Sequence, residues 1–140
     1  MLVRLVYIAC LLFLSGCGFG FVHDETLVGR YKLVAVDTDE QMSLCWSLDS
    51  GNCVGDGLPG PTVFAAGFDD KYVVAAVHPH ESNRSITQYF YVIRDKRNED
   101  SDDSGLSHSR IRGPFSPKDY EIEKARLKLP EFTRIIESLR

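Results

Sequence analysis

The segment 86–94, ITQYFYVIR, limits the possible folds more than any other part of the chain. In an extended strand, successive side chains point to opposite faces of the sheet. One face would carry Tyr89, Tyr91 and Ile93, and the other Phe90 and Val92. Because both sets are apolar or aromatic, each face needs a layer of other residues packed on it. We therefore expect this segment to be an inner strand of a sheet that is covered on both sides.

Other segments rich in strand-forming residues are bounded by turn-forming ones; these are 31–36, 42–48, 63–68 and 71–77. The last two are joined by Asp69-Asp70, which favours a tight turn. The segment 55–61, GDGLPGP, is rich in Gly and Pro and predicts a loop. About five strands that follow one another in local order indicate an antiparallel meander.

A helix is predicted to begin near residue 116. Ser116 is suited to the N-cap, Pro117 to the first helical position, and Asp119 to a capping contact three residues after the cap. The apolar residues that share one side of this helix are Ile122, Ala125 and Leu129.

Pro130 interrupts this pattern, and a second amphipathic helix is predicted after it. Its apolar residues recur at i, i+3, i+4 and i+7, and they are Phe132, Ile135, Ile136 and Leu139. The sequence thus predicts an α+β fold, in which a small antiparallel meander of about five strands carries one or two C-terminal helices. A single domain would extend over residues 29–140, with an acidic surface loop at 95–109.

Residues 1–16 have the layout of a secretory signal peptide. Arg4 supplies a positive charge, 5–14 is an uninterrupted apolar run, and Ser15 and Gly16 are the small residues of a cleavage site. A transmembrane helix needs about 20 apolar residues, so this run is too short to span a bilayer. We therefore expect export followed by cleavage.

The stretch Leu14-Ser15-Gly16-Cys17 resembles the lipobox of bacterial lipoproteins. The resemblance implies that Cys17 is lipidated on sulfur and becomes the N-terminus after cleavage. Its partner would be the lipid bilayer, which acyl chains such as palmitate enter. Residues 17–28 would then be the lipidated cysteine and a short tether. The alternatives are an ordinary secreted protein with Cys17 near its cleavage site by chance, and a short anchor that is retained.

Position 18 bears on the destination of such a lipoprotein. Gly18 is not the aspartate that resembles an inner-membrane retention signal, which favours the periplasmic side of the outer membrane if the host has one. The chain carries 16 Lys and Arg against 20 Asp and Glu, and loss of Arg4 would make the mature chain more acidic. This balance argues against nucleic acid or an anionic membrane surface as a partner.

The cysteines support export. Cys10 would leave with the signal peptide and Cys17 would be lipidated, so Cys45 and Cys53 would be the remaining thiols. In an oxidising compartment such a pair most simply forms a disulfide across the turn-like segment 46–52. The alternative is a reactive or metal-binding pair, for which no third ligand lies nearby in the sequence.

Potential metal ligands occur in two short clusters, His23-Asp24-Glu25 and His78-Pro79-His80-Glu81. Neither cluster has the spacing of a recognised zinc motif. We interpret both as ordinary surface turns.

The acidic loop contains the first half of a calcium-binding pattern. Asp100, Asp102, Ser104 and Gly105 match positions 1, 3, 5 and 6, but position 12 is Ile111 instead of glutamate. The sequence therefore predicts a solvated loop, no metal site and no cofactor. It also contains no Gly-x-Ser-x-Gly motif and no phosphate-binding glycine loop, and we assign no catalytic residue.

Three stretches, GFDDKYVVAAVHP, QYFYVIRD and GPFSPKDYEIEKARLKLPEF, together resemble a family of small single-domain bacterial lipoproteins whose domain has no known function. The similarity extends over about residues 29–132, and it implies an anchored domain of the cell envelope or periplasm. No catalytic or binding residue carries over.

The function expected from the sequence is that of a membrane-anchored envelope lipoprotein, acting as a protein-binding or accessory module. One alternative is a small metal-dependent hydrolase that uses His78, His80 and Glu81. The other is a purely structural component of the envelope.

Overall fold

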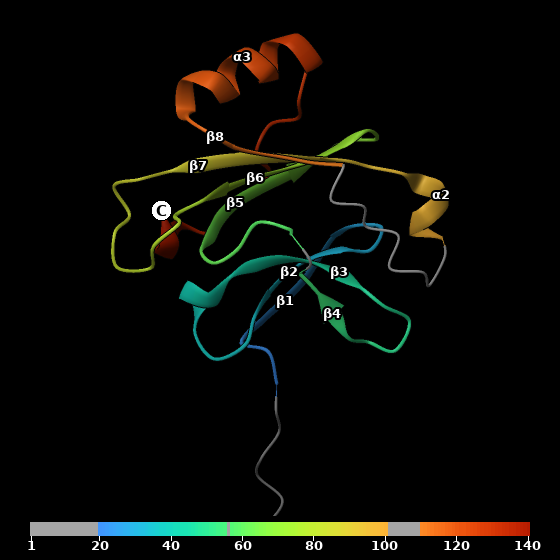
Figure 1. Cartoon of the computed structure of the whole chain (residues 1–140). Helices are drawn as coiled ribbons and strands as arrows, with labels where there is room; N and C mark the ends of the chain where they lie inside the picture. The colour runs from blue at the N-terminus through green and yellow to red at the C-terminus, as the bar shows by residue number, and fades with distance from the viewer. Residues whose placement is uncertain (1–19, 56, 101–109) are drawn as a thin grey trace, which may run out of the picture.

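The computed structural model describes residues 20–55, 57–100 and 110–140. Its strands form two antiparallel sheets, one of four strands and one of five. Figure 1 shows these sheets as stacked layers, with the helix α3 (Pro117–Leu127) on the far side of the five-stranded sheet. The fold is α+β, as the sequence predicts, but with more strands than expected.

The four-stranded sheet has the order β1-β2-β3-β4. Its strands are β1 (His23–Val28), β2 (Tyr31–Ala35), β3 (Ser43–Ser47) and β4 (Cys53–Val54). A short 3-10 helix, η1 (Asp39–Gln41), lies between β2 and β3. Cys45 and Cys53 form the expected disulfide, which joins β3 to β4 with 5.7 Å between the Cα atoms.

The five-stranded sheet has the order β8-β7-β6-β5-β9. Its strands are β5 (Val63–Phe68), β6 (Tyr72–Val77), β7 (Gln88–Ile93), β8 (Ile111–Phe115) and β9 (Arg134–Ile135). The remaining short helices are α2 (Lys96–Glu99) and η3 (Glu137–Leu139). None of the helices in the described part of the chain has both the length and the apolar character needed to cross a bilayer.

Two hydrophobic clusters hold the layers together. The larger one fills the space between the sheets and includes Leu33, Leu44, Trp46, Val73 and Val92. The smaller one lies between the five-stranded sheet and the segment containing α3, and it consists of Val74, Tyr91, Tyr120 and Leu129. Burial of each large apolar side chain contributes about 1.5–3 kcal/mol, so the five-stranded sheet is stabilised from both of its faces.

Strand β7 confirms the expectation drawn from its alternating pattern. Phe90 and Val92 contact the cluster between the sheets, whereas Tyr89 and Tyr91 contact the cluster under α3. The strand pairs with β6 on one side and β8 on the other. It is therefore an inner strand covered on both faces, because the apolar side chains of neither face could remain in water without a free-energy cost. Ile93, at the end of the strand, is an exception and is 37 % exposed.

The predicted single meander of about five strands is wrong in its arrangement. The five expected strands are present as β2, β3, β5, β6 and β7, but the first two belong to a different sheet from the other three. The loop that contains Pro59 and Pro61 lies between β4 and β5, where the chain passes from one sheet to the other. The additional strands β4 and β9 contain two residues each, which is too short for a period-2 pattern to show.

The boundaries expected for the tether and the acidic loop also change. Residues 23–28, expected in the tether, form β1 and pair with β2, so the folded part begins before residue 29. Residues 96–99, expected in the solvated loop, form α2, and Glu99 is buried. The half-matched calcium pattern falls mostly on residues 101–109, which lie outside the described residues.

The predicted second C-terminal helix is wrong. Its segment forms β9 and η3, and its backbone bonds to β5: the Thr133 N–H donates to the Ala66 carbonyl at 3.0 Å and the Ile136 N–H to the Phe64 carbonyl at 2.8 Å. Pairing with the edge strand supplies the hydrogen-bond partners that these backbone groups would otherwise have within a helix.

The start of α3 is predicted correctly, but its buried side is not. The Ser116 side chain accepts a hydrogen bond from the Asp119 N–H, as the capping pattern requires. Ile122 is 57 % exposed, whereas Tyr120 is buried. Leu129 of the expected stripe is buried but lies beyond the end of α3, and the buried residue within the helix is Tyr120, whose ring stacks on Tyr89 of the sheet with 4.6 Å between ring centroids.

Candidate functional site

A row of side chains across the five-stranded sheet creates a hollow. Ala65 of β5 is paired with Ile135 on one side and with Ala76 of β6 on the other, and Ala76 is paired with Tyr89 of β7. Helix α3 packs mainly on β7 and β8, and β5 lies beyond the part of the sheet that it covers (Figure 1). Two adjacent alanines between larger neighbours therefore leave space above the sheet.

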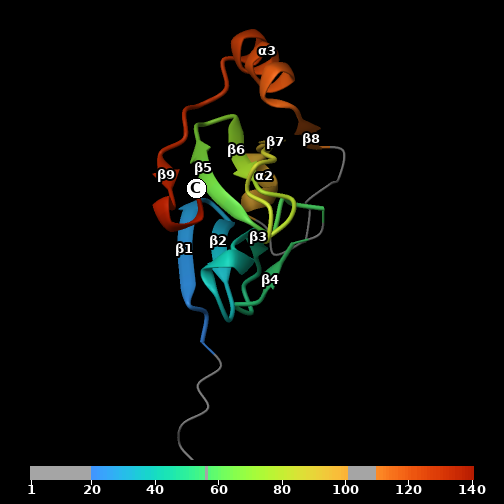
Figure 2. The same ribbon diagram turned by 90° about the vertical axis from the view of Figure 1, so that its left-hand side faces the viewer.

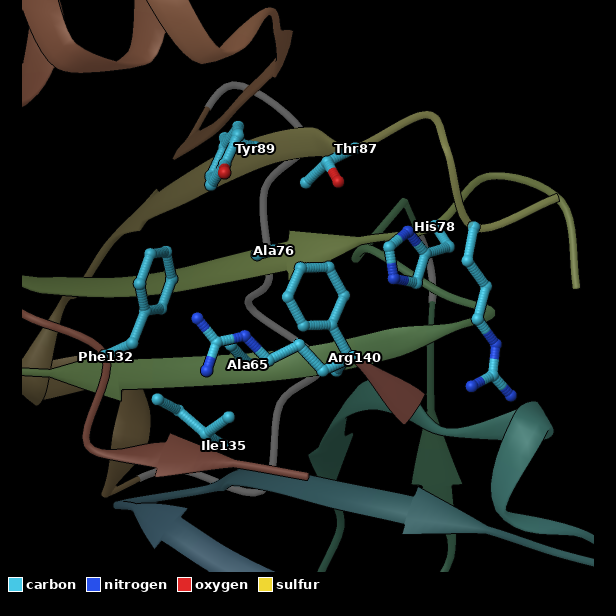
Figure 3. Close-up of a pocket in the computed structure, with 10 residues that line it drawn as sticks. Ala65, Ala76, His78, Thr87, Tyr89, Phe132, Ile135 and Arg140 are labelled. Atoms are coloured by element: carbon cyan, nitrogen blue, oxygen red, sulfur yellow. The ribbon is translucent and has the colours of Figure 1, made fainter. Parts of the chain in front are cut away.

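This space is a pocket of about 400 Å³, a volume within the range of small-ligand sites. Its apolar lining includes Ala65, Ala76, Phe64, Tyr89, Phe132 and Ile135. Its polar lining consists of His78, Thr87, Arg84 and Arg140. Figure 3 shows that these side chains come from the sheet, from the loop before β7 and from the C-terminal segment.

His78 is the most enclosed of the polar residues in the pocket lining, with an exposed fraction of 3 %. Its ring stacks on Phe64 with 4.3 Å between centroids. Its Nδ1 lies 3.0 Å from the carbonyl oxygen of Ile86. Because a carbonyl only accepts hydrogen bonds, Nδ1 carries the proton in this contact, and Nε2 is then the acceptor in the neutral ring.

The Nε2 atom of His78 is buried and has no hydrogen-bond partner within residues 20–55, 57–100 and 110–140. Buried polar atoms in proteins are rarely left unsatisfied, and each one that is needs an explanation, such as a bound water or a functional role. In Figure 3 the imidazole of His78 is turned toward the pocket. A ligand with an O–H or N–H donor could therefore satisfy this nitrogen.

Two arginines give the pocket a positive rim. Arg84 donates a hydrogen bond to the Ser138 carbonyl at 2.7 Å, and its Nη2 lies 3.8 Å from Glu40. The Arg140 guanidinium lies 3.8 Å from the Glu137 carboxylate, with both side chains largely exposed. Both carboxylate contacts are longer than a hydrogen bond, so each arginine can donate to a further acceptor.

The interpretation of the two ligand-rich clusters as surface turns is only partly correct, because residues 23–25 belong to β1 and His78 is buried. His78 is buried in the pocket wall, whereas His80 and Glu81 are exposed in the following turn. In the other cluster, His23 lies 3.4 Å from Glu25, which also forms an ion pair with Arg134. Within the described ranges, no group of three or more His, Cys, Asp or Glu side chains is arranged to hold a metal ion.

Among the pocket residues, the sequence drew attention to His78 as a possible metal ligand, and to Tyr89, Phe132 and Ile135 as apolar residues of predicted elements. Tyr89 was expected in the core, and it does pack against Tyr120 and Phe132 while also forming a pocket wall. One signal was available: the neighbouring strands VFAAGF and YVVAAV both contain two consecutive alanines among larger residues. Only the pairing register of β5 and β6, which the sequence does not give, shows that Ala65 and Ala76 lie side by side.

Comparison of the chain with models of known protein families, with curated proteins and with solved structures finds no match.

Proposed function

We propose that this protein is a lipid-anchored domain of the bacterial cell envelope that binds a partner protein through the pocket over β5 and β6. The observation that carries the anchor is the stretch Leu14-Ser15-Gly16-Cys17, which directly follows the apolar run 5–14. The binding role is supported by the pocket, which combines an apolar floor with a few polar groups, a composition typical of binding sites.

The position of the folded part is compatible with this arrangement. Strand β1 begins at His23, so the tether after Cys17 would consist of residues 18–22, which can span at most about 18 Å. Figures 1 and 2 place the start of β1 and helix α3 at opposite ends of the molecule. The sheet face that carries α3 and the pocket would thus be turned away from the bilayer and toward a partner, on the periplasmic side of the outer membrane if the host has one.

The anchor is tested by replacing the cysteine. Cys17→Ser should accumulate as an uncleaved or mislocalised precursor and should lose incorporation of labelled palmitate. Cys10→Ser is the matched control, because Cys10 lies in the same expected signal peptide outside the lipobox-like stretch. If Cys17→Ser has the mature mass and partitions into the membrane fraction like the unsubstituted protein, the lipoprotein proposal is wrong.

The binding role is tested by filling the pocket. Ala76→Leu adds volume above the sheet, and Ile122→Ala changes an exposed residue of α3 as the control. After gentle crosslinking in cells, capture of the anchored protein should enrich an envelope protein, and Ala76→Leu should reduce this enrichment while Ile122→Ala should not. Equal enrichment by both folded variants would contradict the proposal that the pocket is the binding surface.

A further inference from the structure

The two ends of the pocket offer different chemistry. In Figure 3 the guanidinium of Arg140 extends toward Phe132 and Ile135, whereas His78 and Thr87 lie at the other end. The first end carries the Arg140 guanidinium, which lies 3.8 Å from the Glu137 carboxylate, and the second carries a ring nitrogen that has no hydrogen-bond partner among the described residues and is an acceptor in the neutral ring.

Between these ends the pocket lining is apolar. Ala65 and Ala76 are paired across β5 and β6 and form its floor, while Tyr89 and Phe132 stand beside it. Ala65 and Ala76 are only 3 % and 1 % exposed, so an occupant would lie above them and against the aromatic walls, which favour offset or edge contacts with a ring. The apolar part of an occupant would therefore be flat.

We propose that the pocket binds a ligand with a carboxylate at one end, a hydroxyl donor at the other and a flat aromatic body between them. The carboxylate would pair with Arg140, the ring would lie on Ala65 and Ala76, and the hydroxyl would donate to Nε2 of His78. Both a C-terminal tyrosine of a polypeptide and a free hydroxyaryl acid have this chemistry. The inference rests on the proposed function in taking this pocket as the binding surface.

The charge and the buried nitrogen each exclude other ligand classes. An anion is favoured over a cation because Arg84 and Arg140 both line the pocket, and their carboxylate neighbours, Glu40 and Glu137, are 3.8 Å away and exposed. A ligand without a donor would leave Nε2 of His78 buried and unsatisfied, which carries a free-energy cost.

Calorimetric titration of the mature lipidated protein in detergent micelles tests this ligand class with matched probes. N-acetyl-tyrosine should bind about tenfold more tightly than N-acetyl-phenylalanine, which lacks the donor, as expected for one hydrogen bond to a buried acceptor. It should also bind at least about threefold more tightly than N-acetyl-tyrosinamide, which lacks the charge. Phloretate, a free hydroxyaryl acid, distinguishes the sources: tighter binding of N-acetyl-tyrosine supports a polypeptide end, and tighter binding of phloretate supports a small acid.

Substitutions test which residue of the pocket recognises each end of the ligand. Arg140→Gln should remove the preference for the carboxylate over the amide, whereas Arg97→Gln, at a side chain that is 95 % exposed, should leave it unchanged. His78→Phe should remove the preference for N-acetyl-tyrosine over N-acetyl-phenylalanine. If this variant does not fold, the relative affinities of the unsubstituted protein for the probes still test the ligand class. Equal affinity for all probes, or no binding, would overturn the ligand class. That failure is distinct from failure of the proposed function, which the capture experiment with Ala76→Leu measures.

Discussion

Glu99 and Arg94 form a nearly enclosed ion pair, each side chain being 6 % exposed. The guanidinium donates to both carboxylate oxygens, at 2.9 and 2.7 Å, and also to the Asp69 carbonyl at 2.6 Å. On its other side, the Glu99 carboxylate lies against Gly29, where a Cβ would be 2.0 Å from its oxygen. The Glu99 carbonyl also accepts a hydrogen bond from Arg30 at 2.8 Å. Helix α2 is thereby fixed to the turn between β1 and β2.

Removal of the charge of Glu99 should destabilise the fold, because it would leave the Arg94 guanidinium buried without its counterion. We expect Glu99→Gln to lower the free energy of unfolding by about 3–5 kcal/mol, the usual cost of breaking a buried pair. Denaturant unfolding of the mature protein measures this loss, with Glu121→Gln at an exposed position as the control. A loss for Glu99→Gln no greater than that of the control would show that the pair is not important for stability.

Tyr31 makes the stability of the protein sensitive to alkaline pH. Its burial, and next the nearby Glu99 carboxylate, raise the pKa of its hydroxyl from 10.0 to about 12. A raised pKa in the folded state means that the stabilisation is complete below pH 10 and is lost as the pH rises toward about 12. Burial also raises the pKa of Tyr120.

We expect Tyr31 to ionise at a higher pH than an exposed tyrosine, and to do so together with unfolding of the protein. Tyrosinate absorbance and circular dichroism, followed together above pH 10, should change in one transition, and Tyr31→Phe should shift that transition to higher pH. An unchanged midpoint in Tyr31→Phe would mean that ionisation of this residue does not cause the alkaline unfolding.

At the scale of the elements, the disulfide between Cys45 and Cys53 retains the edge strand β4. This strand has two residues and pairs only through Trp46 with Val54 and Ser47 with Cys53. We expect replacement of both cysteines by serine to lower the free energy of unfolding by about 2–3 kcal/mol, since the closed loop is short. Denaturant unfolding with and without a reductant provides the measurement. If reduction does not change the stability of the unsubstituted protein, the bridge contributes nothing to it.

The elements that the sequence predicts well are those whose signals are local. Alternation identifies β7, and the side chain of Ser116 and the fixed φ of Pro117 identify the start of α3. The segment after Pro130 has helical periodicity, but Thr133 and Ile136 donate their backbone N–H groups to β5. Local hydrophobic periodicity does not predict pairing with a strand that lies more than sixty residues away in the sequence.

At the scale of the whole molecule, the sequence predicts the α+β fold class, which the structure confirms, but not the position of the pocket; export and the lipid anchor stay predictions. The pocket depends on the register that places Ala65 beside Ala76 and on the arrival of Arg140 from the end of the chain. It also depends on α3 covering β7 and β8 and not β5 (Figures 1 and 2). These are relations between distant segments, which a single sequence does not specify by its local pattern.

We propose that the anchored domain contacts its partner over the pocket. The most direct test places a photocrosslinking amino acid in the anchored protein in living cells, either at Ile135 or at Ile122. These isoleucines are matched in exposure, at 46 % and 57 %, but only Ile135 lines the pocket. We expect position 135 to crosslink to a defined envelope protein and position 122 not to do so. Crosslinks to the same protein from position 122 alone, or none from position 135, would contradict it.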